Sequence, residues 1–465
     1  MTKKLIFEEG SFRDPAAKVA YFEDSVLRIV NPSGFKKFEL IEKILRDESI
    51  SRFLVETKVV SSGELQKLNL EKNDQIKVFK HKKIDYISYP YEWSFSRLKD
   101  AALHHLKLHI NLLNHNTTLI DAYSFNIQFD FYKPKFIDVM SIKEYSEGEF
   151  WVGHKQFCES FLNPLILKSK LGIDFNNWFK GNLEGINTKE LSKILKFKHL
   201  FSWNIFYNVF LLNYFEKKYN KNEDLKITKN KKLKKTYYLS ILKNLINFIE
   251  SLKPKKEHTI WGDYSRKNTY DDEEKRNKYE FISKYFKENS INKALDLGCN
   301  NGEYSKLALK SGCKSVVGLD YDLNAIDEAY NDSKKEKINF LPLYFDVSNP
   351  SSNIGWNQKE RKGFLERSKF DAVLALAFEH HLAIAKNIPL KDVIRWILSL
   401  APEGIIEFVP KNDVTIQSML KLKGDIFPDY NLQNFEKYLS ENANIKSQKK
   451  ISNSGRILFA YKNKV

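Results

Sequence analysis

The sequence is poor in cysteine and contains no long apolar stretch. It has three cysteines in 465 residues, too few for a disulfide framework or a four-cysteine zinc site. No run of 18 or more apolar residues occurs, so an ordinary transmembrane helix is not expected. The N-terminus also lacks the apolar stretch of a secretory signal. These absences predict a cytoplasmic protein with no transmembrane segment, and no metal site is expected.

Arginine is scarce as well, although the chain is basic. Lysine and arginine together number 76 against 59 acidic residues, giving a net charge of +17. Only 11 of these cations are arginine, the side chain best suited to bidentate contacts with phosphate. An RNA partner is therefore an alternative interpretation of the positive charge, and it is not the one that we favour. The 42% of hydrophobic residues is enough for more than one core.

A lysine-rich stretch predicts a boundary between two domains. Residues 216–256 hold 13 lysines against four acidic residues, with apolar residues at helical spacing near their end. We expect an N-terminal α+β accessory or substrate domain over 1–215, a helical linker over 216–257 and a catalytic domain over 258–465. A solvated connector is the simplest interpretation of the linker. A basic face that docks on a polyanion or a membrane surface is the alternative.

Just before the linker, residues 199–215 run without any Lys, Arg, Asp or Glu. Their length and asparagine content favour a buried or interfacial helix over a membrane span. Peripheral attachment to a membrane surface, helped by the adjacent lysines, is the alternative interpretation.

The C-terminal part alternates short apolar runs with helical periodicity, which is typical of a parallel α/β sheet. We expect a Rossmann-like domain with a seven-stranded sheet, in which ligands bind beyond the carboxyl ends of the strands. The strands are expected at 293–299, 315–319, 339–345, 370–376, 404–409, 445–451 and 456–461, and helices at 303–310 and 390–400.

Acidic residues follow three of these strands in a pattern that suits one ligand. Asp296, Gly298 and Gly302 form D-x-G-x-x-x-G, whereas a dinucleotide fingerprint needs three glycines. A carboxylate at this point would repel pyrophosphate but suits an ammonium group. Asp320 is placed to accept hydrogen bonds from a ribose, and Asp346 from an adenine amino group. A ligand with an ammonium, a ribose and an adenine but no phosphate is S-adenosylmethionine.

These residues resemble those of class I S-adenosylmethionine-dependent methyltransferases over roughly 258–465. The resemblance implies that Asn300 and Tyr321 also contact the cofactor, and that Tyr264 belongs to an aromatic entry segment covering its methionine end. Several phrases are further similar to the bacterial methyltransferases related to nodulation protein NoeA, which carry an additional N-terminal half: Asn353–Trp356, Ala377–Ile384, Glu407–Lys411 and Ile426–Tyr430.

The loop after the fourth strand is where an acceptor should meet the methyl group. His380 or His381 is the candidate base or acceptor clamp, and Glu407 is a further catalytic candidate. The chain lacks the (D/N/S)-P-P-(Y/F) pattern of amine methylation on bases and glutamine. We therefore expect methyl transfer to an oxygen or nitrogen of a small molecule, lipid or glycan. An RNA methyltransferase that uses the basic linker and a non-catalytic scaffold are the alternatives.

The N-terminal part contains one pattern that resembles protein-kinase-like folds. Asp121 and Asn126 are spaced as in a catalytic loop, and Asp138 follows the next apolar run. Arg28 would stand where the nucleotide lysine is found, with Glu39 or Glu42 as its partner. The glycine-rich phosphate loop is absent, so an unrelated α+β domain that selects substrate is the alternative.

Overall fold

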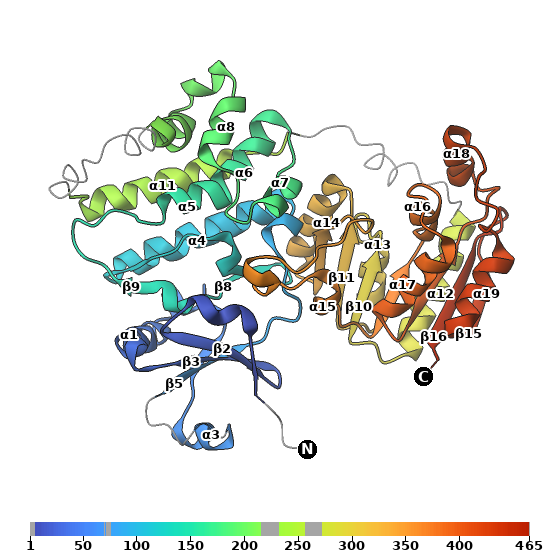
Figure 1. The fold of residues 1–465 in the computed structure, drawn as a ribbon, viewed down its shortest axis with the longest axis horizontal. Helices are drawn as coiled ribbons and strands as arrows, with labels where there is room; N and C mark the ends of the chain where they lie inside the picture. The colour runs from blue at the N-terminus through green and yellow to red at the C-terminus, as the bar shows by residue number, and fades with distance from the viewer. Residues whose placement is uncertain (1–4, 69, 71–75, 215–231, 256–271, 465) are drawn as a thin grey trace. The chain divides into compact units, whose positions relative to one another are not determined.

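The computed structural model describes residues 5–68, 70, 76–214, 232–255 and 272–464. The chain divides into two compact units (Figure 1). Unit 1 comprises Met1–Glu257 together with the short segment Ile354–Arg361, and unit 2 comprises His258–Asn353 and Lys362–Val465. Within the described ranges, no helix is long and apolar enough to cross a membrane.

Unit 1 begins with a five-stranded antiparallel sheet of order β1-β2-β3-β5-β4. Helix α1, Phe35–Leu45, leaves β3 and buries Phe38, Ile41 and Ile44. The ring of Phe38 stacks on that of Phe79 of β5 at 4.1 Å, which fixes the helix on the sheet. The strands are β1 Ile6–Phe7, β2 Ala17–Phe22, β3 Ser25–Val30, β4 Thr57–Val59 and β5 Lys77–Lys82.

The rest of unit 1 is mainly helical and is organised around α4, Phe95–Asn114, which buries twelve of its residues. The linker helix expected from the sequence is α11, Lys235–Ser251, which packs along α4 and buries Tyr238, Leu242, Leu245 and Ile249. This helix is therefore part of the core of unit 1. Two short antiparallel pairs follow α4: β6 Thr117–Leu119 with β9 Ile142–Glu144, and β7 Ile127–Asp130 with β8 Lys133–Phe136.

Residues 199–215, expected to form a buried or interfacial helix, are mostly helical and partly buried over the part that the structure describes. A 3-10 turn at Phe197–Phe201 precedes a continuous helix over 203–214, in which α9, Trp203–Ile205, is followed by a π-helical stretch at Phe206–Leu211. Ile205 and Val209 are buried, whereas Phe201 and Trp203 are exposed. The lack of charged residues does not determine which side chains of this segment are buried, because burial depends on the parts of the chain that pack against it. The remaining helices of unit 1 are α2 Glu48–Ser51, α3 Ser62–Lys67, α5 His154–Phe157, α6 Asn163–Ile166, α7 Asn176–Gly181 and α8 Thr188–Ile194.

Unit 2 contains the expected seven-stranded sheet, which is mixed, with the order β12-β11-β10-β13-β14-β16-β15. The first five of these strands are parallel, and β16 runs antiparallel to both of its neighbours. The central strands are buried on both faces, which explains their continuous apolar runs. The edge strand β15 exposes lysines, which disfavours pairing with another chain. The strands are β10 Lys293–Leu297, β11 Ser315–Asp320, β12 Phe340–Tyr344, β13 Ala372–Ala375, β14 Glu403–Phe408, β15 Ala443–Lys450 and β16 Ile457–Asn463.

Three helices share one core cluster with this sheet. Ile282 of α12, Ala308 of α13 and Ile326 of α14 pack with alternate strand residues such as Val316 and Phe340. Alternation along the strands places the intervening residues on the opposite face. The helices of unit 2 are α12 Asp272–Glu288, α13 Glu303–Lys310, α14 Leu323–Glu336, α15 Phe364–Arg367, α16 Glu379–Ala383, α17 Leu390–Leu400, α18 Val414–Lys423 and α19 Leu432–Asn442.

Candidate active site

The turn between β10 and α13 requires glycine at two positions. Gly298 has φ +70° and Gly302 has φ +84°, a left-handed conformation that side chains disfavour. A Cβ on Gly302 would lie 2.3 Å from the ring of Phe340, and one on Gly298 would lie 3.1 Å from the ring of Phe378. Asn300 also has a positive φ, +49°. The turn is thus a tight backbone loop at the carboxyl end of the central strand, and we call its residues 298–302 the glycine loop.

Asp296, in β10, is almost completely buried. Its Oδ2 accepts a hydrogen bond of 2.6 Å from the hydroxyl of Ser305 on α13. Burial raises the pKa of this carboxyl to about 7, since a charge loses hydration in the interior. The residue therefore ties the strand to the helix behind the glycine loop, and its charge changes near neutral pH.

Asp320 ends β11 and holds the glycine loop directly. Its Oδ2 accepts from the backbone N–H of Asn300, and its Oδ1 accepts from that of Asp322, both at 2.8 Å. Burial raises its pKa above the ordinary value. The backbone of Tyr321 also interacts with this carboxylate, and a carboxylate can accept about four hydrogen bonds, so the side chain keeps capacity for a further donor.

Two other expected cofactor residues lie at the ends of neighbouring strands. Tyr321 follows Asp320 and is 62% exposed, with its ring 5.7 Å from that of Tyr344. Asp346 follows β12 and accepts from both the backbone N–H and the hydroxyl of Ser348. Tyr264 lies outside the described residues.

The loop after β13 brings a carboxylate and two imidazoles together. Ala377 has φ +48°, an uncommon conformation that marks strain at the end of the strand. Glu379 and His380 are both buried, and Glu379 Oε2 lies 3.7 Å from His380 Nδ1. Neither of these two atoms makes a hydrogen bond within the described chain. The other oxygen of Glu379 accepts from the backbone N–H of Val409 at 3.0 Å and lies 2.8 Å from the hydroxyl of Tyr430.

His381 lies beside His380, with 4.3 Å between the ring centroids. Burial and the neighbouring imidazole lower the pKa of His381 to about 3. The ring is therefore neutral throughout the physiological range, and it can hold a ligand by hydrogen bonding without introducing a charge.

Glu407, the third catalytic candidate, lies in the interior of β14. Its side chain is fully buried, with Oε2 2.7 Å from Lys278 Nζ and Oε1 3.5 Å from an amino group of Arg456. Arg456 also makes a two-point ion pair with Asp413, at 2.7 and 2.9 Å. Both oxygens of Glu407 are therefore engaged in a buried ionic network, an arrangement that favours a structural role.

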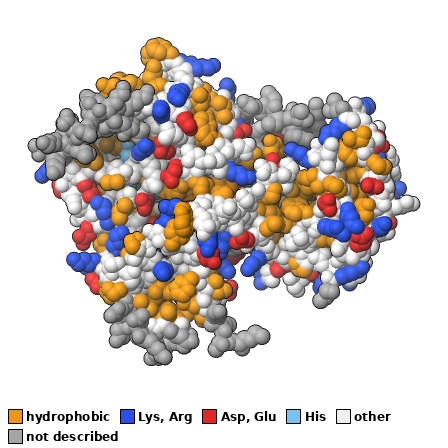
Figure 2. Space-filling view, in the orientation of Figure 1, with side chains coloured by type: hydrophobic (Ala, Val, Ile, Leu, Met, Phe, Trp, Pro, Cys, Tyr) orange, Lys and Arg blue, Asp and Glu red, His pale blue; other side chains and the backbone are white. Residues whose placement is uncertain are grey.

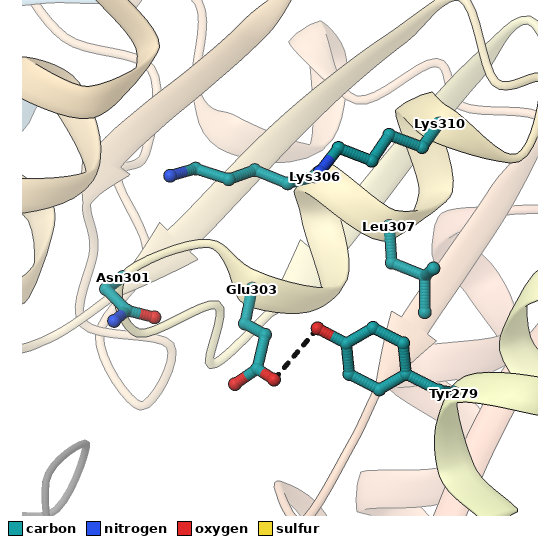
Figure 3. Close-up of a pocket in the computed structure, with 6 residues that line it drawn as sticks. All are labelled: Tyr279, Asn301, Glu303, Lys306, Leu307 and Lys310. Carbon is teal, nitrogen blue, oxygen red and sulfur yellow. Dashed lines mark hydrogen bonds between the residues drawn. The ribbon is translucent and has the colours of Figure 1, made fainter. Parts of the chain in front are cut away.

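The structure also contains a pocket that the sequence did not indicate. It has a volume of about 270 Å³ and lies between α12, the glycine loop and α13. The hydroxyl of Tyr279 donates to Glu303 at 2.9 Å across the pocket (Figure 3). Burial and this carboxylate raise the pKa of Tyr279 to about 12. The lining residues are Tyr279, Asn301, Glu303, Lys306, Leu307 and Lys310.

The kinase-like residues of unit 1 are arranged differently from the expectation. Arg28 forms its ion pair with Asp138, at 3.0 Å, and not with a glutamate of α1. Glu39 pairs with Lys77 and Glu42 with Arg46, so the expected partner of Arg28 is wrong. Burial and the nearby Asp138 raise the pKa of Asp121.

The segment Ile354–Arg361, which the chain inserts between β12 and β13, belongs to unit 1. Its ends are joined by two backbone hydrogen bonds between Ile354 and Arg361, of 3.0 and 3.1 Å. We call this closed loop the insertion loop. Its contacts in unit 1 are the ion pairs Arg13–Glu360 and Glu9–Lys359, the ring pair Phe12–Trp356, and Arg361 over the ring of Phe125.

Comparison with known proteins agrees with this geometry. Residues 267–439 match the family described as methyltransferase domain. The fold and the site define an S-adenosylmethionine-dependent methyltransferase, with S-adenosylmethionine as its cofactor. Over 455 residues the chain is 39% identical to the nodulation protein NoeA of Rhizobium meliloti (strain 1021), covering 97% of this chain and 95% of that protein. The chain belongs to the family of that protein.

Two solved structures are similar to part of the chain. The PH0226 protein of Pyrococcus horikoshii OT3 is 20% identical, with 44% of this chain and 99% of that chain covered and a TM-score of 0.31. The N-methyltransferase NodS of Bradyrhizobium japonicum WM9 is 13% identical, with 42% and 98% covered and a TM-score of 0.31.

Proposed function

We propose that unit 2 transfers a methyl group to an oxygen or nitrogen of a small molecule, lipid or glycan, with His380 as the base. The observation that carries this proposal is the buried pair formed by Glu379 and His380 at the end of β13. Next to it in the chain, Phe378 lies against Gly298 of the glycine loop. Groups that could bind the cofactor and a group that could accept a proton therefore meet at one end of the sheet.

The described residues fit S-adenosylmethionine. Asp320 has free acceptor capacity for the ribose hydroxyls, and the exposed ring of Tyr321 offers a face for the adenine. The left-handed glycines allow close approach of the backbone to the methionine part, and Asp296 and Asn300 lie at the same loop. Asp346 is assigned to the adenine amino group.

The cofactor supplies an electrophilic methyl group on sulfur, so positioning is the main requirement. When the acceptor oxygen or nitrogen takes the methyl group that the bound cofactor would supply, Nε2 of His380 would accept the proton that the acceptor loses. Glu379 faces Nδ1 of the same ring and stabilises the imidazolium that forms. His381, which stays neutral, holds the acceptor. Glu407 supports the site through Lys278 and Arg456.

The first experiment is calorimetric titration with S-adenosylmethionine. Asp320→Ala should lower the affinity by about tenfold or more, because a hydrogen bond between a carboxylate and a hydroxyl contributes about 1.5–3 kcal/mol. Asp392→Ala, at an exposed position on α17, is the matched control and should bind as the wild type does. Equal affinity of both variants would refute the assignment of Asp320.

The acceptor class has its own test. Wild type and His380→Asn are incubated with methyl-labelled cofactor and with separated lipid, glycan and small-molecule fractions of a bacterial extract. Label should enter one of these fractions with the wild type only. An RNA fraction of the same extract is tested in parallel, and label in RNA alone would refute the proposed acceptor class in favour of an RNA methyltransferase.

We infer that unit 1 has a kinase-like fold that serves as an accessory domain. The support is its order of elements: a five-stranded antiparallel sheet with α1 after β3, then α4, and Asp121 and Asp138 after β6 and β8. Arg28 is paired with Asp138, and residues 9–13 form a 3-10 turn without a glycine-rich sequence. We therefore expect no binding of magnesium-ATP in a direct titration, and micromolar binding would contradict the accessory role.

A further inference from the structure

Unit 1 exposes an unusual group of aromatic side chains within a short stretch of chain. Phe197, Phe201 and Trp203 are 75%, 78% and 71% exposed, and Tyr207 is more than half exposed. Single exposed apolar residues are normal on protein surfaces, but a cluster of this kind indicates an interaction site. We call these four residues the aromatic patch.

The aromatic patch is held outward by a well-packed framework. Ile205 and Val209, on the same turns, are buried. Asn208 interacts with His154 at 2.8 Å, and Asn213 donates to Ser192 of α8 at 2.9 Å. The ring of Trp203 stacks on that of Tyr207 at 5.8 Å, and Phe197 meets Phe201 edge-on at 5.7 Å. The exposed rings are thus paired with one another on an anchored segment.

Exposed lysines lie close to these rings in the chain. Four exposed lysines lie on α8 and the following turn, at positions 189, 193, 196 and 198, and none is ion-paired to a described acidic residue. Glu190 is the only acidic residue between 185 and 214. Figure 2 shows hydrophobic side chains beside Lys and Arg side chains at the upper edge of the molecule, over the segment that carries α8.

We propose that the aromatic patch and its lysines bind an anionic lipid surface. Rings of this kind settle in the interfacial layer of a bilayer, and lysines are attracted by anionic headgroups. One lipid surface supplies both the apolar layer and the negative charge that this mixture of side chains needs. No described helix can span a bilayer, so the contact is peripheral. The proposal does not depend on the methyl acceptor.

The test is co-sedimentation of the full chain with vesicles of phosphatidylcholine containing 30% phosphatidylglycerol, and with vesicles of phosphatidylcholine alone. The wild type should bind the anionic vesicles and lose binding as salt is raised. The triple variant Phe197→Ser, Phe201→Ser, Trp203→Ser should bind at least about tenfold more weakly. So should a variant with all four lysines changed to glutamate.

Matched controls separate this effect from general loss of exposed apolar surface. The triple variant Val152→Ser, Leu365→Ser, Val414→Ser removes three exposed apolar residues from other places and should bind as the wild type does. Because all substituted positions are exposed, thermal melting should be unchanged in every variant. Quenching of tryptophan fluorescence by brominated lipid should fall in Trp203→Phe, which reports insertion of that ring.

Three outcomes would overturn the proposal. The first is a wild type that stays in the supernatant at low salt. The second is a patch variant that binds vesicles as tightly as the wild type. The third is concentration-dependent dimerisation in ultracentrifugation that the patch variant abolishes, with no vesicle binding, which would assign the aromatic patch to a second copy of the chain.

Discussion

The ammonium of Lys278 on α12 lies 2.7 Å from Oε2 of Glu407 on β14, and both side chains are almost completely buried. The pair joins helix α12, which precedes β10 in the chain, to β14, which is separated from β10 in the sheet by β13. Arg456 of the segment before β16 completes the network through the other oxygen of Glu407. A buried charge that loses one of its partners is costly, because water does not replace the lost interaction in the interior.

Lys278→Ala should therefore lower the free energy of unfolding by about 3–5 kcal/mol. The matched control is Lys462→Ala, which removes the exposed cation of an ion pair with Glu403 on the same sheet and should cost less than about 1 kcal/mol. Urea denaturation measures both. A loss below about 1 kcal/mol for Lys278→Ala would show that the network contributes little.

A pair of glycines separates backbone strain from steric contact. Gly302 and Gly424 both have positive φ, but a Cβ on Gly302 would lie 2.3 Å from the ring of Phe340, whereas nothing lies within 4 Å of one on Gly424. Gly424 has ψ 158°, in a region of backbone space that is essentially restricted to glycine, so Gly424→Ala should cost about 1–3 kcal/mol for conformation alone. Gly302→Ala should cost about 1–3 kcal/mol more, from overpacking, and should weaken cofactor binding. Equal melting temperatures for the two variants would contradict this.

The histidines of α4 predict a loss of stability in acid. Burial lowers the pKa of His104 to about 4 and of His109 to about 3, and that of His105 well below the ordinary value. The unfolded chain takes up these protons below about pH 6.5 and the folded chain does not, so the free energy of unfolding falls as the pH falls from about 6.5 towards 4. Each histidine contributes about 1.4 kcal/mol per pH unit.

His105→Phe should remove the contribution of one histidine from this dependence, so that the free energy of unfolding changes by about 1.4 kcal/mol less per pH unit. The ring of His105 makes no hydrogen bond in the described chain and lies among Phe136, Phe157 and Phe161, so phenylalanine fits chemically. His115→Phe, at the partly exposed end of the same helix, is the control. Chemical denaturation at a series of pH values measures the slope, and an unchanged slope for His105→Phe would locate the uptake elsewhere.

The tautomer of His380 tests its partnership with Glu379. The carboxylate faces Nδ1, so the proton should reside on Nδ1 in the wild type, leaving Nε2 as the acceptor. In Glu379→Gln the carbonyl should keep the hydrogen bond from Val409, and the amide N–H should point at Nδ1 and move the proton to Nε2. Nitrogen NMR of labelled histidine reports the tautomer, with His380→Asn for assignment. Tyr430→Phe, which leaves Oε2 in place, should retain the wild-type tautomer.

The insertion loop can be tested by proteolysis. Arg13→Glu replaces the cation beside Glu360 with a second carboxylate. The two negative charges repel each other, so the insertion loop should lose this contact with residue 13, and trypsin should cleave faster after Lys359 and Arg361. The charge swap that combines Arg13→Glu with Glu360→Arg should restore protection. Cleavage at the wild-type rate in Arg13→Glu would show that the ion pair does not hold the loop.

Much of the fold of unit 2 could be predicted from the sequence, because apolar strands and glycine turns are specified by residues that are close together in the chain. The predicted positions of all seven strands lie within a few residues of the observed ones, and Gly298 and Gly302 stand where the turn needs a left-handed backbone. Glu407 shows the limit of this reasoning. An acidic residue within an apolar strand suggested a catalytic role, but Lys278 and Arg456, distant in the chain, contact its two oxygens.

What the sequence determined by itself was therefore the Rossmann-like domain and the acidic residues that follow its strands, since periodicity and turn chemistry depend on neighbours in the chain. Only the tertiary structure decided which charges meet. It paired Arg28 with Asp138, set Glu379 against His380, assigned Ile354–Arg361 to unit 1, and left Phe201 and Trp203 exposed in a segment without charge. Burial and partner choice depend on residues far apart in sequence, so no local pattern encodes them.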